Sequence, residues 1–213
     1  AETYNLEEVR RRAIIWQGRA LGYSGLHGEA ARYLEQYAED DEACVFRGEI
    51  EILAGNPRDA RKWLTTRQNP GKRRFMPPDT VDWSSLIADA EGRTVGYELD
   101  NAALFDYRHA LELYARGMDE HDSACAVDLH ALTRSERAAR MNPGVGLYSL
   151  LCYLLEEQLD NPPVDSQTVL SRAFKNLQQR AGRIEDRGQR EFYMEKNYWN
   201  RMLIEAARMH KFI

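Results

Sequence analysis

The residues of this chain that could perform metal chemistry lie between positions 109 and 130. His109 precedes the run Asp119-Glu120-His121-Asp122, and Asp128 and His130 follow it. A hydrolytic metal centre needs several histidine and carboxylate ligands that converge and leave one coordination position open. The spacing here is loose, because an expected helix break separates His109 from the run and no second histidine pair accompanies it.

A histidine followed by a His-Asp pair on helices resembles the metal-binding pattern of HD-type phosphohydrolases. That resemblance implies a metal-dependent phosphohydrolase that uses His109, His121 and Asp122. Acidic residues are also common at the start of a helix, where they interact favourably with the helix dipole. We therefore expect a solvated helix start at this run, and the phosphohydrolase stays an alternative.

Other catalytic sequence patterns are missing from the chain. It contains no GxSxG nucleophile elbow and no glycine-rich phosphate loop ending in GK[ST]. The segment Gly22-Tyr23-Ser24-Gly25 is expected to be a turn between two helices. We therefore expect no catalytic residues, no cofactor and no enzymatic activity.

The elements that must position any functional residue are expected to be helices. Of 213 residues 43% are hydrophobic and 30% charged, which is typical of a globular chain, and 7 Pro and 14 Gly favour helix over an all-β fold. Roughly ten helices are expected. In the C-terminal half one ends at Gly117, one runs from 119 to about 141, an apolar one covers 146–159, and two more cover 165–181 and about 188–210.

Two stretches near the N-terminus, 13–34 and 43–64, are near copies of each other displaced by 30 residues. A repeat with this period is typical of an architecture that stacks one supersecondary unit on the next. Glycine at the turn supplies the positive φ that a tight helix–helix connection needs. The identical pairs are Ala13/Ala43, Gly18/Gly48, Gly25/Gly55, Ala30/Ala60 and Leu34/Leu64.

This pattern resembles the tetratricopeptide repeat (TPR), which has small residues at its eighth and twentieth positions and a turn glycine at its fifteenth. The resemblance covers residues 8–68 and implies stacked helical hairpins in a right-handed α-solenoid. The chain departs from the family in its period, which is 30 rather than 34. It also departs at the seventh and eleventh positions, where the family prefers large apolar residues and this chain has Gln17 and Leu21, then Arg47 and Glu51.

The family lines its concave face with the first helix of each hairpin, at positions two, five, nine, twelve and thirteen. Carried over, these positions are Arg12, Ile15, Arg19, Gly22 and Tyr23, then Glu42, Val45, Glu49, Ile52 and Leu53. At least half of them are expected to pack against a neighbouring hairpin. Arg12, Arg19, Tyr23 and Glu49 are the candidates for partner binding, because Arg and Tyr are enriched in binding hot spots. Ile15 and Arg19 stand where the family's two-carboxylate clamp has Lys and Asn, so that clamp is not expected.

The segment after the second hairpin breaks the helical rhythm. It is rich in Pro, Gly and Arg, and within it Arg73 and Arg74 are further candidate partner contacts. We divide the chain into two TPR-like hairpins (1–68), an irregular insert with a short helix (69–100), and further hairpins with a C-terminal capping helix (101–213). The third part is expected to continue the domain that the first part begins.

Charge and cysteine content exclude several classes of partner. The net charge is −5, from 29 basic and 34 acidic residues, so electrostatic binding of nucleic acid is not expected. Three widely spaced cysteines form no disulfide framework. They favour a cytoplasmic location, with the periplasm as the alternative if Ala1 follows a cleaved signal peptide. The longest apolar stretch, 147–155, is too short for a membrane helix.

The sequence therefore predicts an all-α protein that acts as a non-catalytic scaffold or adaptor. It would bind a protein or peptide partner through the concave face of the stack, without inserting into a membrane. One alternative is an oligomeric accessory subunit of a transport or secretion complex, in which the chain forms homo-oligomers. The others are the HD-like phosphohydrolase and a small-ligand pocket between the insert and the C-terminal helices.

Overall fold

The computed structural model describes residues 6–65, 101–134, 144–163 and 165–211, and over these residues the chain is all-helical. The expected all-α class is confirmed. Ten helices are described: α1 (Leu6–Tyr23), α2 (His27–Glu35), α3 (Asp41–Leu53), α4 (Pro57–Thr65), α6 (Asn101–Glu120), α7 (Ser123–Thr133), α9 (Gly144–Glu156), α10 (Ser166–Ala181), α11 (Arg187–Glu195) and α12 (Tyr198–Met209).

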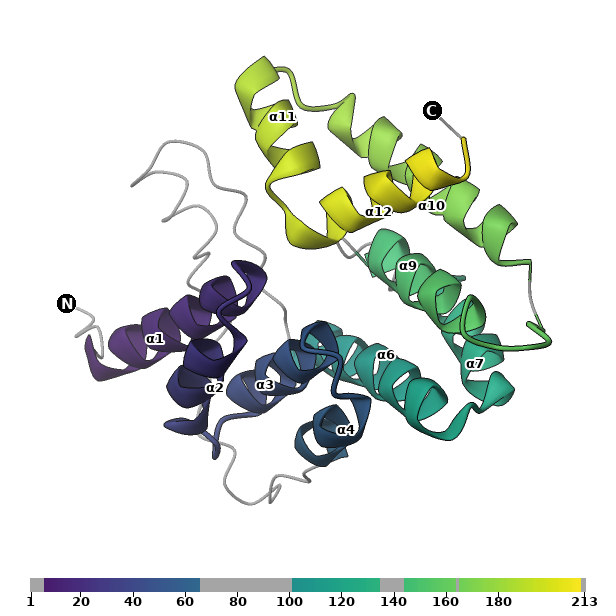
Figure 1. The fold of residues 1–213 in the computed structure, drawn as a ribbon. Helices are drawn as coiled ribbons and strands as arrows, with labels where there is room; N and C mark the ends of the chain where they lie inside the picture. The colour runs from purple at the N-terminus through teal and green to yellow at the C-terminus, as the bar shows by residue number, and fades with distance from the viewer. Residues whose placement is uncertain (1–5, 66–100, 135–143, 164, 212–213) are drawn as a thin grey trace.

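The helices follow an arc (Figure 1), and consecutive described helices pack against each other. Helices α1, α3, α6, α9 and α12 each contact the next in that order, and we call them the inner helices. Helices α2, α4, α7 and α10, the outer helices, each pack on the inner helix before them and the inner helix after them. The inner helices therefore form a continuous surface along the arc.

The two hairpins predicted from the repeat make the same contacts. A Cβ on Gly18 would lie 3.0 Å from the Cγ of Leu34, and one on Gly48 would lie 2.6 Å from the Cγ of Leu64. These glycines allow each inner helix to approach its outer helix closely, as expected. The turn glycines Gly25 and Gly55 have φ angles of +84° and +79°, which confirms the left-handed conformation predicted for them.

Side-chain caps begin several helices where the sequence predicted a boundary. Asp40 accepts hydrogen bonds from the backbone amides of Glu42 (2.8 Å) and Ala43 (3.2 Å) at the start of α3. Asp165 accepts one from Thr168 (3.2 Å) at the start of α10. Such caps satisfy amide groups that have no partner inside the helix.

Several helix boundaries differ from the prediction. The helix expected from 119 to about 141 is α7, which begins at Ser123 and ends at Thr133, since residues 119 and 120 belong to α6. The helix expected to end at Gly117 continues to Glu120, because this glycine serves a close contact instead: its Cβ would lie 2.6 Å from Leu155 of α9. The single helix expected from about 188 to 210 is two helices, α11 and α12. Asn197 ends the first and caps the second by accepting a hydrogen bond from the Asn200 amide at 3.2 Å, since a short polar side chain competes with the helical backbone.

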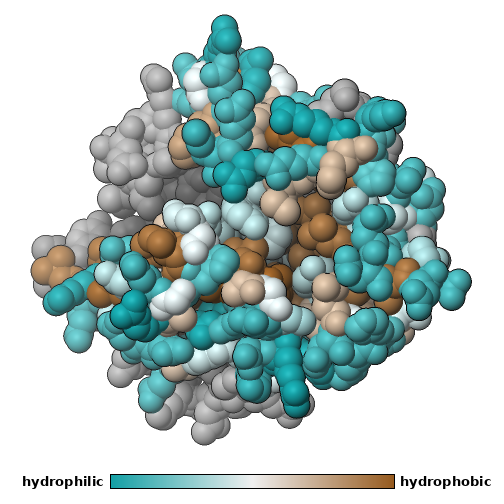
Figure 2. Space-filling view, in the orientation of Figure 1, coloured by the Kyte–Doolittle hydropathy of each residue, from teal (hydrophilic) through white to brown (hydrophobic). Residues whose placement is uncertain are grey.

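The hydrophobic core runs without interruption from Ile15 on α1 to Ala207 on α12. Helix α9 is central to it, as expected from its apolar sequence, with Tyr148, Leu150 and Leu151 completely buried. Apolar residues also gather in the middle of the face shown in Figure 2, and hydrophilic residues dominate its periphery. Among the described helices none is both long and apolar enough to cross a membrane. The short helix predicted within 69–100 lies outside the described residues.

Candidate functional site

A buried carboxylate, Glu49 of α3, lies where four inner helices meet. Its side chain is completely buried. Arg19 of α1 binds both carboxylate oxygens, from Nε to Oε2 at 2.9 Å and from Nη2 to Oε1 at 3.2 Å. Oε1 also accepts hydrogen bonds from the Trp199 indole N–H (2.8 Å) and from the hydroxyls of Tyr23 and Tyr107. We call these five residues the Glu49 cluster.

The helical arrangement explains why these residues meet. Arg19 and Tyr23 are four residues apart and therefore lie on one face of α1. Tyr107 comes from α6 and Trp199 from α12, which are 58 and 150 residues away from Glu49 in the sequence. The cluster therefore connects the first helix of the arc with the last.

The electrostatics of the cluster keep Glu49 paired with a permanent cation. Burial, the largest single cause, lowers the pKa of Arg19, but the attractions to Glu49, Tyr23 and Tyr107 and the hydrogen bond to Glu49 together raise this pKa well above its usual value. Burial raises the pKa of both Tyr23 and Tyr107 well above the usual value for a phenol. Both phenols thus remain protonated and donate to Glu49. A buried charge is costly without such partners.

Aromatic rings surround the guanidinium of Arg19. Its central carbon lies 4.1 Å from the ring centroid of Phe46, 5.2 Å from those of Trp16 and Tyr23, and 5.5 Å from that of Tyr107. These distances allow cation–π attraction, which is strongest where water is excluded. The Tyr23 ring in turn stacks on Tyr198 of α12, with centroids 5.0 Å apart and planes 9° apart.

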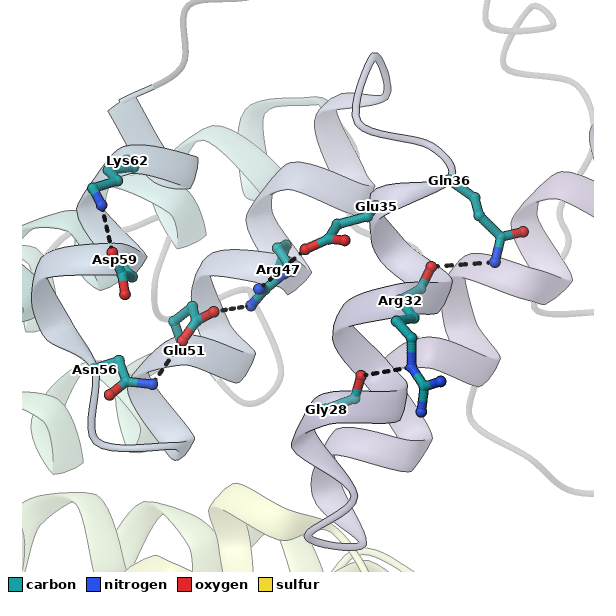
Figure 3. A network of polar contacts seen from close by, with 9 residues as sticks. All are labelled: Gly28, Arg32, Glu35, Gln36, Arg47, Glu51, Asn56, Asp59 and Lys62. Carbon is teal, nitrogen blue, oxygen red and sulfur yellow. Dashed lines mark hydrogen bonds and ion pairs between the residues drawn. The ribbon is translucent and has the colours of Figure 1, made fainter.

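A second polar network lies on another side of α3 (Figure 3). Arg47 forms a buried ion pair with Glu51 one turn later and reaches Glu35 of α2 at 3.4 Å. Asn56, in the turn before α4, donates to Glu51 at 3.0 Å. The Arg47 guanidinium also lies 5.3 Å from the Trp63 ring centroid. We call these residues the Arg47 network, in which Arg47 and Glu51 stand at the seventh and eleventh positions of the second repeat, where the chain departs from the TPR pattern.

The predicted concave positions pair with each other across the repeat. Arg19 and Glu49 are equivalent residues of the two repeats, 30 residues apart. Arg12 and Glu42 are also equivalent, and Arg12 Nε lies 4.0 Å from Glu42 Oε2 with the Arg12 side chain 30% exposed. Each pair has arginine in the first repeat and glutamate in the second, so opposite charges join α1 to α3.

Of the predicted partner-binding residues, the structure brings Arg19, Tyr23 and Glu49 together and leaves Arg12 at a partly exposed position on the same helix. The burial of Glu49 means that its carboxylate faces the interior. Arg73 and Arg74 lie outside the described residues. Binding of a partner by any of these residues stays a prediction.

Sequence reasoning missed the other two members of the Glu49 cluster. Neither Tyr107 nor Trp199 was among the candidate residues. One signal was available: a glutamate at an inner position needs hydrogen-bond donors, and Tyr and Trp are the aromatic residues that carry one.

The residues of the phosphohydrolase alternative have other partners. Asp122 caps α7 by accepting a hydrogen bond from Ala124 N at 3.0 Å, and Asp119 and Glu120 both lie 2.7 Å from Arg61 of α4. His109 and His121 are exposed. In the part of the chain that the structure describes, no group of three or more His, Cys, Asp or Glu side chains could hold a metal ion.

Comparison with known families gives one match. Residues 97–211, more than half of the chain, match the model of TP_0123_C, which is described as a C-terminal domain. The chain belongs to the TP_0123_C family. No curated protein and no solved structure is similar to it. The TP_0123_C segment runs from α6 to α12 and so contributes Tyr107 and Trp199 to the Glu49 cluster, whereas Arg19, Tyr23 and Glu49 precede it.

Proposed function

We propose that this protein is a non-catalytic scaffold or adaptor that binds a protein or peptide segment along the inner helices of a TPR-like, right-handed solenoid. The observation that carries the proposal is that the first two hairpins repeat the same contacts at equivalent positions. Equivalent glycines approach equivalent leucines, and equivalent inner positions pair arginine with glutamate. Stacked hairpins of this kind produce an extended inner surface, which such proteins use for binding.

The inner side of α1 and α3 carries charged, aromatic and apolar side chains of the kinds that bind peptides. Partly exposed Arg12 offers charge-assisted hydrogen bonds, and the partly exposed rings of Trp16 and Tyr23 beside Arg19 offer flat apolar surface. Tyr, Trp and Arg are the residues most enriched at binding hot spots. Two further inner positions, Ile52 and Leu53, are partly buried against the core and provide apolar surface beside them.

Photo-cross-linking tests this proposal. A photoreactive amino acid is placed at Arg12 on the inner side or at Arg32 on outer helix α2, whose only described hydrogen bond from the side chain is to Gly28 O within its own helix. We expect a cross-linked partner in extract from the position of Arg12 and none from that of Arg32. An Arg12→Glu exchange in a chain labelled at Ile52 should reduce the adduct, and Arg32→Glu should leave it unchanged. Equal adducts from both labelled positions would count against an inner binding surface.

A further inference from the structure

The last inner helix reaches the first two through side chains rather than through helix packing. Among the described helices α12 packs its backbone on α9, α10 and α11, and α1 and α3 are not among its principal packing partners. It nevertheless meets both through consecutive aromatic residues. Tyr198 stacks on Tyr23 of α1, and Trp199 donates its indole N–H to Glu49 of α3 at 2.8 Å.

These two aromatic side chains cover surface that the proposed function assigns to a partner. Tyr23 and Glu49 are inner positions of the two repeats, and each is already engaged by the chain's own C-terminal residues. A peptide could reach them only after Tyr198 and Trp199 had moved away. The chain's own residues therefore indicate which groups of a ligand would fit there: an aromatic ring that stacks on Tyr23 and an N–H group that donates to Glu49.

We propose that the Tyr198-Trp199 pair is an intramolecular occupant of the binding site, and that the partner is a peptide segment with adjacent aromatic residues that replaces it. The proposal rests on the proposed function. Arg201 follows Tyr198 by three residues on α12, and its guanidinium lies 5.5 Å from the Tyr198 ring centroid, so a basic residue near the aromatic pair favours binding. Occupation by the chain itself lowers the apparent affinity by the fraction of molecules that are open.

The test supplies the occupant as a separate molecule. A fluorescent peptide with the sequence of residues 195–206, EKNYWNRMLIEA, is titrated into the full-length chain carrying Tyr198→Ala and Trp199→Ala. Because the site is vacant in this variant, the peptide should bind it at least about tenfold more tightly than it binds the wild type. A matched peptide with both aromatic residues replaced by alanine should not bind. Equal binding to both chains, or equal binding of both peptides, overturns the proposal.

If the double variant does not fold, Trp199→Phe provides the same test. This exchange removes the N–H donor to Glu49 together with part of the indole ring, so the Tyr198-Trp199 pair is held less tightly while a phenyl ring still fills most of the core position. The wild-type peptide should then bind the Trp199→Phe chain several-fold more tightly than the wild-type chain, because the intramolecular hydrogen bond to Glu49 is lost. Unchanged affinity overturns the proposal.

Combined with photo-cross-linking, the result separates this proposal from the one on which it rests. A partner that cross-links at the position of Arg12, together with a peptide that fails to bind the vacated chain, leaves the scaffold proposal standing and overturns self-occupation. A peptide that binds the vacated chain, with no partner cross-linked at the inner side, supports the assignment of the site and contradicts the scaffold proposal.

Discussion

Helix α3 takes part in two buried Arg–Glu pairs whose surroundings differ. In the Glu49 cluster the carboxylate is completely buried, and its donors come from three other helices as far as 150 residues away. In the Arg47 network both charged residues belong to α3 itself, and their further partner Glu35 is half exposed. The first pair holds distant parts of the arc together, whereas the second replaces apolar packing within one pair of hairpins.

The difference shows that identical residue types can have unequal consequences for the fold. A local pair forms as soon as its helix forms, so its loss affects one region. A pair assembled from α1, α3, α6 and α12 exists only when the whole arc has folded. The stability of the chain should therefore respond far more strongly to changes in the Glu49 cluster.

The largest effect is expected from Glu49→Ala. It leaves three neutral donors without their shared acceptor and buries the Arg19 charge with only the Tyr107 hydroxyl to accept from it, which should lower the free energy of unfolding by about 3–5 kcal/mol. Urea denaturation followed by circular dichroism measures this loss. Glu42→Ala is the matched control, since Glu42 is the equivalent glutamate of a looser pair with partly exposed Arg12, and it should cost no more than about 1 kcal/mol. Equal losses of unfolding free energy in the two variants would contradict the expectation that the Glu49 cluster contributes most to stability.

A smaller effect is expected when the Arg47 network is broken. Glu51→Ala deprives buried Arg47 of its ion pair and should cost about 1–3 kcal/mol, with Glu35 and Trp63 still in contact. The double exchange Arg47→Met/Glu51→Leu installs the apolar residues that TPR hairpins prefer. It should be neutral or stabilising, because apolar packing often replaces a buried ion pair without loss.

The same double exchange in the Glu49 cluster sharpens the contrast. Arg19→Met/Glu49→Leu also removes both charges, but Tyr23, Tyr107 and Trp199 then have no common acceptor, so the chain should stay clearly less stable than wild type. The two double variants are compared by urea denaturation at one pH. Equal stability of the two would mean that the neutral donors contribute nothing, against the geometry of the cluster.

The sequence predicted the local features of both regions better than their connections. Gly18, Gly48, Gly25 and Gly55 were placed correctly because each requirement, a close contact or a positive φ, is met within one hairpin. The Glu49 cluster could be anticipated only in part. The inner positions followed from the repeat, but nothing periodic connects them to a tryptophan 150 residues away.

The wrong helix boundaries have a related cause. A glycine in a helical pattern can mark an end or a close contact, and only the presence of Leu155 beside Gly117 decides between them. Asn197 breaks the last predicted helix although its neighbours are compatible with one, because its side chain accepts a hydrogen bond from the Asn200 amide in the first turn of α12. Tertiary contacts and side-chain caps thus override the pattern.

The dependence of stability on alkaline pH should arise from the Glu49 cluster and not from the Arg47 network. Burial raises the pKa of Tyr23 and Tyr107 above the usual value of 10.0, so the folded state retains these protons where the unfolded state loses them. Stability should be unaffected by these groups below pH 10 and should fall above it, by about 1 kcal/mol for each phenol over the first pH unit. Tyr23→Phe should reduce this fall, whereas Glu51→Ala should leave it unchanged, because no tyrosine hydroxyl donates to Glu51 among the described contacts. A slope that is the same in Tyr23→Phe and wild type would contradict the assignment.

The smallest effect should come from Glu35→Ala, at the exposed edge of the Arg47 network. The Glu35 side chain is 50% exposed and lies 3.4 Å from Arg47, so water screens the pair and replaces the lost acceptor. We expect a change of less than about 0.5 kcal/mol in the free energy of unfolding, which is typical of exposed ion pairs. The measurement is again urea denaturation, with Glu51→Ala as the comparison on the same arginine. A loss in Glu35→Ala as large as that in Glu51→Ala would mean that Arg47 depends on α2 as strongly as on its own helix, and the Arg47 network would then not be local.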